Sequence, residues 1–232
     1  DNNIGIGTAA LGGPIAGGEE NVVIGNSAAD ALTSADGNVV MGHNAAGALT
    51  TGGNNVIIGR EAVQTGVLTG ADNVVIGKEA GKVLTGGADN VIIGKDAGKA
   101  MEGAGFSVCV GRSAGEDMVS NRLTAIGYYA GANTTATGNT FLGFNTGSAN
   151  IGGEYNVAMG YNALYQPDGE SYNVAIGTDA LGGAIAGGEG NVAVGSSTLV
   201  AVTSGDYNTA IGHNAGVGIT TGDYNVAIGE DN

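Results

Sequence analysis

Several residue types are scarce in this 232-residue chain, and each scarcity narrows what the chain can be. It has no Trp, two Pro and a single Cys, Cys109. One cysteine cannot close a disulfide within the chain, and no apolar run reaches the roughly 20 residues of a membrane span. The sequence therefore predicts neither an internal disulfide nor membrane insertion.

Basic residues are also few. Seven Lys and Arg stand against 22 Asp and Glu, which gives a formal net charge of −15. Such a surface repels phosphate and anionic lipid, so neither nucleic acid nor an anionic membrane is expected as a partner of the whole surface.

Glycine is abundant instead, with 47 residues at regular positions. A five-residue pattern of the type Asn225-Val226-Ala227-Ile228-Gly229 recurs fourteen times, 16 to 18 residues apart. Its last residue, which we call the anchor, is Gly7, Gly25, Gly42, Gly59, Gly77, Gly94, Gly111, Gly127, Gly143, Gly160, Gly177, Gly195, Gly212 and Gly229. So short a period is typical of a solenoid. We expect one all-β array over residues 1–232: a parallel β-solenoid, or β-roll, of about fourteen rungs of about 17 residues.

A longer repeat is superimposed on the short one. Residues 1–62 match residues 171–232 at 33 of 62 positions without a gap, an offset of 170 residues or ten rungs. This super-repeat indicates a tandem duplication, and we expect the chain to be a fragment of a longer fibre. The consensus is irregular over about residues 107–151, where the stack could bulge or change shape.

The residues before the anchor predict a strand. Asn stands four positions before it in twelve of fourteen copies, with Ser107 and Leu123 as exceptions, and predicts a side-chain ladder along the stack. The residues one and three positions before the anchor share one face and are apolar or Thr. The residue between them, Val23 or Ala175 for example, is also apolar; we expect it to face outward, where a lone solenoid would carry polar residues.

A strand that is apolar on both faces needs a second partner. We expect another copy of the chain to cover the outer face, in a three-fold parallel homotrimer. A dimer, or a second wall within the same rung, would serve the same purpose. Ala three residues after the anchor, in eleven of fourteen copies, indicates close approach of two walls. A second, weaker strand is predicted by a further apolar column, which is followed by Thr in five rungs: Leu32, Leu49, Leu84, Met101, Met118, Val202 and Ile219.

The units Asn173-Val174-Ala175-Ile176-Gly177 and Asn156-Val157-Ala158-Met159-Gly160 resemble the repetitive shafts of phage tail-fibre proteins. They are also similar to the head repeats of trimeric autotransporter adhesins. This resemblance covers essentially the whole chain. It implies a trimeric β-solenoid outside the cell or on a virion, acting as a spacer or adhesive surface. The rung is longer than the adhesin repeat, which favours the tail-fibre comparison.

No group of residues predicts catalysis, a metal site or a cofactor. His43 and His213 lie in equivalent turns ten rungs apart and are expected to be solvated. The Ser residues lack His and an acid at useful spacing. Acidic turns such as Gly87-Ala88-Asp89-Asn90 could hold Ca²⁺, but ordinary turn Asp is the simpler interpretation.

The residue directly after the anchor varies most and is expected to face solvent. Seven of these residues form a candidate partner-binding stripe: Arg60, Lys78, Lys95, Arg112, Tyr128, Phe144 and Tyr161. The basic part could dock an anionic glycan, or, with Glu61, Glu79 and Asp96 alongside, be a solvated mixed-charge face. The aromatic part could bind sugar or protein, or simply shield irregular rungs.

We therefore expect a non-enzymatic shaft of an extracellular or virion fibre, a rigid spacer that self-associates and could attach to a cell-surface glycan. The alternative is a bacterial surface adhesin or self-assembling filament that binds a polysaccharide or another repeating surface such as ice. Glu102, Val119 and Asp168 interrupt the Thr column, which counts against ice.

Overall fold

The computed structural model describes residues 2–119, 121–167, 169–185 and 188–231. It divides into two compact units, Asp1–Asn121 (unit 1) and Arg122–Asn232 (unit 2). Each unit is a parallel β-solenoid, and the described residues form no helix, so the predicted all-β solenoid fold is confirmed. Asp168 and part of the super-repeat, residues 186 and 187, lie outside the described residues.

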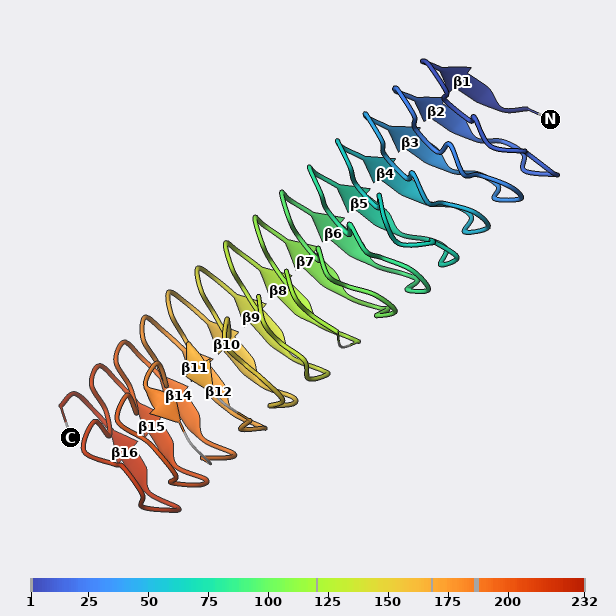
Figure 1. Ribbon diagram of the computed structural model, residues 1–232. Helices are drawn as coiled ribbons and strands as arrows, with labels where there is room; N and C mark the ends of the chain where they lie inside the picture. Colours follow the sequence, from blue (N-terminus) through green and yellow to red (C-terminus); the bar gives the residue numbers. More distant parts are fainter. Residues whose placement is uncertain (1, 120, 168, 186–187, 232) are drawn as a thin grey trace. The chain divides into compact units, whose positions relative to one another are not determined.

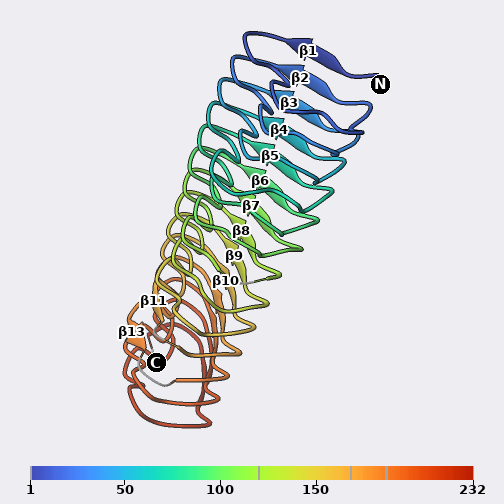
Figure 2. The ribbon, with the colours of Figure 1, turned by 45° about the vertical axis from the view of Figure 1, so that its right-hand side comes forward.

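Every rung carries one three-residue strand that ends just before its anchor glycine (Figures 1 and 2). The strands of unit 1 are β1 (Ile4–Ile6), β2 (Val22–Ile24), β3 (Val39–Met41), β4 (Val56–Ile58), β5 (Val74–Ile76), β6 (Val91–Ile93) and β7 (Val108–Val110). Those of unit 2 are β8 (Thr124–Ile126), β9 (Thr140–Leu142), β10 (Val157–Met159), β12 (Val174–Ile176), β14 (Val192–Val194), β15 (Thr209–Ile211) and β16 (Val226–Ile228). Two short strands, β11 (Gln166–Pro167) and β13 (Ala184–Ile185), pair separately.

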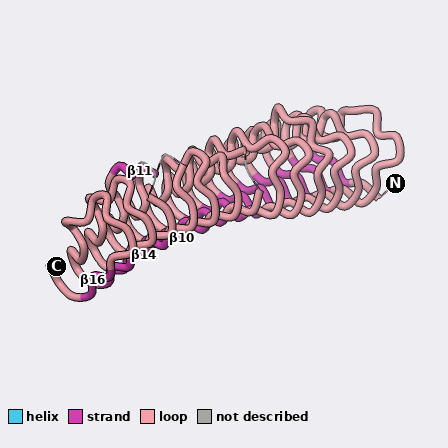
Figure 3. Tube along the Cα trace, turned by 90° about the horizontal axis from the view of Figure 1, so that it is seen from below, coloured by secondary structure: helices cyan, strands magenta, loops and turns pink. Residues whose placement is uncertain are grey.

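Within each unit, successive strands pair in parallel and in register, so that equivalent residues face each other. Val23 opposes Val40, for example, and Ala158 opposes Ala175. The strands occupy one wall of the coil, while the rest of each rung is loop and turn (Figure 3). Hydrogen bonds between rungs continue through these turns, as from the amide of Ala29 to the carbonyl of Ala45 at 2.9 Å. The backbone is thus bonded along the stacking direction on both sides of the rung.

The core lies inside each rung, and it includes the central residue of the strand. In the middle rungs of both units this residue is fully buried, as at Val23, Ile57, Ala158 and Ala193. The prediction that this column faces outward is therefore wrong. The rung interior also contains the Ala column and the Leu column, so the central side chain packs there against its own chain. The apolar side chains facing outward are instead those of the first and third strand residues.

The Asn ladder is confirmed. The Oδ1 atom of Asn21 accepts hydrogen bonds from the backbone amide and the Nδ2 group of Asn38, both at 3.0 Å. In unit 2 the Oδ1 atom of Asn156 accepts from the backbone amide of Asn173 at 2.8 Å. The Nδ2 groups also donate to the main chain of the next rung, as from Asn173 to the carbonyl of Gly188 at 3.1 Å. These buried amides therefore tie strand to loop as well as rung to rung.

All fourteen anchor glycines have a positive φ, between 129° and 146°. A Cβ on Gly59 would lie 2.2 Å from the carbonyl oxygen of Gly77, the anchor of the next rung. Glycine is required here both for the backbone conformation and for the close approach of successive rungs.

The predicted second strand is largely wrong. Leu32, Leu49 and Leu84 are fully buried, as expected for an apolar column. The backbone of Leu32 and Leu84, however, is irregular loop; outside the pair β11 and β13, the described residues form one isolated bridge in this part of the rung, between Leu49 and Leu68. Single rung-to-rung hydrogen bonds, such as that from Thr33 to Thr50 at 3.1 Å, replace a ladder. The Leu column belongs to the core without belonging to a sheet.

Candidate partner-binding stripe

The seven stripe residues are all exposed and follow their anchors directly, so each projects from the end of a strand. The basic residues Arg60, Lys78, Lys95 and Arg112 lie in unit 1, and the aromatic residues Tyr128, Phe144 and Tyr161 lie in unit 2. In-register pairing of the strands aligns each set in a column. The two sets are chemically distinct surfaces and are treated separately.

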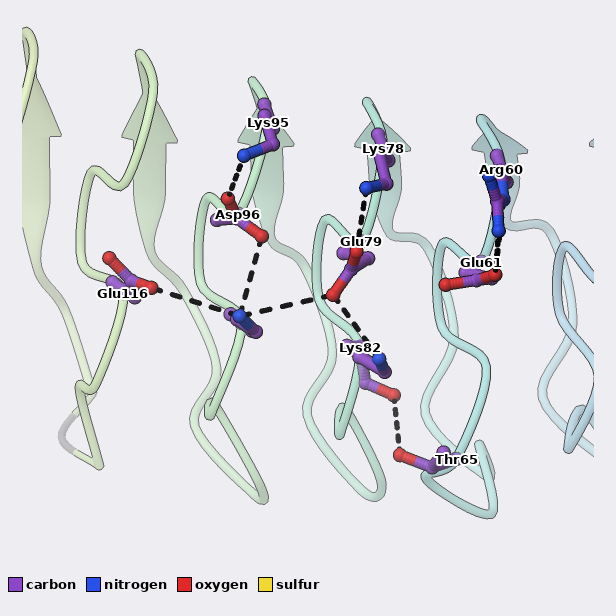
Figure 4. Close-up of polar contacts among 10 residues, drawn as sticks. Arg60, Glu61, Thr65, Lys78, Glu79, Lys82, Lys95, Asp96 and Glu116 are labelled. Atoms are coloured by element: carbon purple, nitrogen blue, oxygen red, sulfur yellow. Dashed lines mark hydrogen bonds and ion pairs between the residues drawn. The ribbon is translucent and has the colours of Figure 1, made fainter.

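The basic residues are paired with carboxylates of their own rungs (Figure 4). Arg60 meets Glu61 at 3.0 Å, Lys78 meets Glu79 at 3.1 Å and Lys95 meets Asp96 at 2.9 Å. The three acids have positive φ values of 58° or 59°, which places each beside the preceding base. A solvated mixed-charge face is the simpler description of this surface, because these three cations are already neutralised at short range.

Two further lysines join the network, and one of them connects neighbouring rungs. Lys82 contacts Glu79 at 3.2 Å, and Lys99 lies 3.5 Å from Asp96, 3.8 Å from Glu79 and 4.0 Å from Glu116. Lys99 thus joins acids from three successive rungs. The sequence shows the acid beside each base, but the bridging by Lys99 depends on how rungs stack. The signal in the sequence for the contact between Lys99 and Asp96 was their spacing of three residues.

The network perturbs the pKa values of its members. Hydrogen bonds from Lys78 and then Lys82 hold the pKa of Glu79 at about 2. For Asp96, burial alone would raise the pKa, but the hydrogen bond from Lys95 and the charges of Lys99 and Lys95 outweigh it and lower the pKa. Burial opposes the charge on Lys99, but Asp96 and Glu79 outweigh it and raise its pKa. All three groups are therefore held in their charged forms.

The aromatic residues stack on one another. The ring centroids of Tyr128 and Phe144 are 5.1 Å apart at an interplanar angle of 8°, and those of Phe144 and Tyr161 are 5.2 Å apart at 7°. Tyr129 meets Tyr128 edge to face at 4.5 Å. Because the ring faces cover each other, the inner surfaces are not open for stacking on a sugar, and ring edges form most of the accessible surface of this column. Two separate Tyr pairs also stack, Tyr155 with Tyr172 and Tyr207 with Tyr224.

Other candidates for chemistry are sparse in the described part of the chain. His43 and His213 are exposed, and the structure places them in different units. No group of three or more His, Cys, Asp or Glu residues there could hold a metal ion. A polar depression of about 220 Å³ lined by Ser27, Asp30, Asn44, Gly47 and Gln64 is smaller than a usual ligand pocket. Among the described residues, no helix meets the length and hydropathy required to cross a bilayer.

In comparisons with known proteins, no family model and no curated protein matches the chain. The likeness to tail-fibre shafts therefore depends on the repeat motif itself.

Proposed function

We propose that this chain is the structural, non-enzymatic shaft of an extracellular or virion fibre, comparable to a phage tail fibre, and that it works as a rigid spacer assembled as a homotrimer. The observation that carries the proposal is the rung-to-rung hydrogen bonding. In each unit, strand, Asn ladder and turns all bond along the same direction. Stretching or bending such a stack must strain many bonds at once, which is the property a spacer needs.

The proposed trimer is supported by apolar side chains that face outward. The expected reason for assembly was the central strand column, but that column is covered by its own chain. The first and third strand residues supply the exposed apolar surface instead, as at Val39, Met41 and Ile211. A solitary solenoid would leave these side chains in water in every rung.

Particle mass and symmetry test the proposal directly. Light scattering coupled to size-exclusion chromatography should give about three times the 22.4 kDa of the chain. Averaged electron micrographs of the same sample should show rods with three-fold symmetry. A monodisperse monomer of 22.4 kDa would overturn the trimeric fibre.

A second candidate is an adhesin or filament that binds a polysaccharide, and the exposed column of Tyr128, Phe144 and Tyr161 favours it. Aromatic edges and the outermost ring face can still contact a sugar. Glycan-array binding that is lost in Tyr161→Ala and retained in Arg60→Ala would support this role. Equal binding by both variants, or none by the parent chain, would argue against the aromatic column as a glycan site.

A further inference from the structure

The outward faces of the strands form an apolar surface on each unit. We call this the outer sheet face and define it as the first and third residues of the three-residue strands. It comprises Ile4, Ile6, Val22, Ile24, Val39, Met41, Val56, Ile58, Val74, Ile76, Val91, Ile93, Val108 and Val110 in unit 1. In unit 2 it comprises Thr124, Ile126, Thr140, Leu142, Val157, Met159, Val174, Ile176, Val192, Val194, Thr209, Ile211, Val226 and Ile228. All are exposed or half-buried.

The outer sheet face excludes charge. The chain has 29 charged residues, the sum of 7 basic and 22 acidic, yet none of the 28 positions of the face carries one. Three are Thr and the other 25 are Val, Ile, Leu or Met. In a chain of net charge −15, copies repel each other except where their surfaces are neutral. The face is the neutral surface through which two copies can meet.

The size of the face also indicates a partner. Seven strands about 4.8 Å apart, each three residues of about 3.3 Å, cover roughly 300 Å² in one unit. That is comparable to the largest apolar patch on a typical monomeric protein, and each unit has such a face. Two copies that met through the face of one unit would bury roughly 600 Å² in total, below the roughly 1,000 Å² of a specific interface, whereas the faces of both units would bury roughly 1,200 Å², so we expect both units to contribute.

The spacing of the face identifies the partner as a second copy. The side chains repeat once per rung over seven successive rungs in each unit. A partner with the same repeat can place a side chain between each pair of rungs along the whole face. A globular partner would contact only a few rungs and leave the rest in water.

We propose that the outer sheet face is the surface through which copies of this chain associate. This inference depends on the proposed fibre function, because it assigns the contact surface of that assembly. The interface is a dry layer of Val, Ile and Met from adjoining sheets, while the central strand residues stay inside each rung.

A charge-neutral double variant in the full chain tests the inference. Met159 and Ile176 are register partners on the face, 37% and 36% exposed. The variant Met159→Lys with Ile176→Glu places a lysine beside a glutamate on the face. In a monomer the two charges form a solvated ion pair, but in an assembly they would be buried, and the loss of their hydration would oppose association. The matched control, Thr178→Lys with Ser196→Glu, introduces the same charges on two neighbouring rungs, two residues beyond the register partners Ile176 and Val194 and outside the face.

Sedimentation velocity should show the parent chain and the control as assemblies and the face variant as a monomer, a three-fold loss of mass for a trimer, with unchanged circular dichroism. If the face variant assembles like the parent chain, the inference fails and the proposed fibre stands. If the parent chain is itself monomeric at every concentration, both fail.

A milder substitution covers the case in which the charged variant does not fold. Ile176→Cys and Thr178→Cys each add one thiol, and the native Cys109 is buried with its pKa raised to about 12 by desolvation, so it stays unreactive in the folded chain. In the assembly, maleimide should label Cys at position 176 at least tenfold more slowly than at 178, and dilution should remove the difference. Equal rates in the assembled protein would overturn the inference.

Discussion

Part of unit 1 and part of unit 2 fill the interior of a rung with opposite choices of side chain. In β5 and β6 of unit 1 the strand centre is large, Val75 or Ile92, and the fourth residue after the anchor is Gly81 or Gly98. In β10, β12 and β14 of unit 2 the strand centre is Ala and that fourth residue is Leu, in the pairs Ala158 and Leu164, Ala175 and Leu181, and Ala193 and Leu199. Each of these side chains is fully buried.

The two positions share one space. A Cβ placed on Gly81 would lie 3.3 Å from Cγ1 of Val75, and one on Gly98 would lie 3.3 Å from Cγ2 of Ile92. In these five rungs the strand and the following turn therefore divide one interior space between them. The residue at the strand centre and the fourth residue after the anchor therefore have to be considered together.

Phe141 is the extreme of the strand-filled type, and removing it should have the largest effect. A Cβ on Gly131 would lie 2.9 Å from its ring, and one on Gly147 would lie 2.5 Å from it. Phe141→Ala therefore leaves a cavity that neither glycine can fill, and we expect a loss of about 3–5 kcal/mol in the free energy of unfolding. Guanidinium unfolding followed by circular dichroism measures it. The control, Phe144→Ala on the exposed column, should cost about 1 kcal/mol; similar losses would refute a core role for Phe141.

Converting a turn-filled rung into a strand-filled one should test the shared volume itself. Leu181→Gly removes a buried side chain and Ala175→Ile overpacks the same rung, each at about 2–3 kcal/mol. The double variant reproduces the pairing of Ile92 with Gly98 and should recover about 1–3 kcal/mol relative to the sum of the single changes. A double-mutant cycle in guanidinium measures this coupling. Strictly additive losses would show that the positions fill separate spaces.

The reverse experiment in unit 1 should have a smaller effect. Gly98→Ala adds one methyl group against Ile92 at a position with φ of 51°. We expect about 1–2 kcal/mol of destabilisation from crowding and the left-handed backbone. Combining it with Ile92→Val should relieve the crowding but not the backbone cost. If Gly98→Ala is neutral, the space beside Ile92 is not filled.

The smallest expected effect concerns the charged network of unit 1. Because the pKa of Glu79 is lowered to about 2 in the folded chain from an ordinary 4.5, its stabilising contribution is present above pH 4.5 and is lost as the pH falls towards 2. The carboxylate is near the surface, so we expect at most about 1 kcal/mol at low salt. Unfolding of Glu79→Gln against the parent chain at pH 2.5 and pH 6 measures it. A difference that is the same at both pH values would contradict the assignment to charge.

The rung, its strand and its Asn ladder could be predicted because each depends on the period of the sequence. The face of the strand that points inward could not, since Val23 and its neighbours Val22 and Ile24 are all apolar. Only the stacking of the whole rung shows that Val23 packs against the Ala and Leu columns. The loop that contains Leu84 was mistaken for a strand because burial, and not strand pairing, makes its side chain apolar.

The sharp corners of the rung were also invisible in the sequence. The second residue after every anchor has a positive φ, including Glu61, Tyr129 and Ser197, and only some of these are residue types that favour it. For the candidate stripe, the exposure of the side chains could be predicted, because the residue directly after the anchor varies most among the repeats. The link from Lys99 to Glu79 and Glu116 required the distance between rungs, which a linear sequence does not give.

The in-register ladder of Asn side chains makes the length of this molecule adjustable in whole steps. Each Asn amide forms its ladder hydrogen bonds only with the neighbouring rungs. Rungs of 16, 17 and 18 residues therefore occur in one chain, because the loops accommodate the extra residues. If the codons for one complete rung were inserted or lost, the Asn residues on either side would still form the ladder. The length of the solenoid would change by about 4.8 Å, and the remaining rungs would keep their contacts. Such a protein can evolve a new span by recombination between its own repeats.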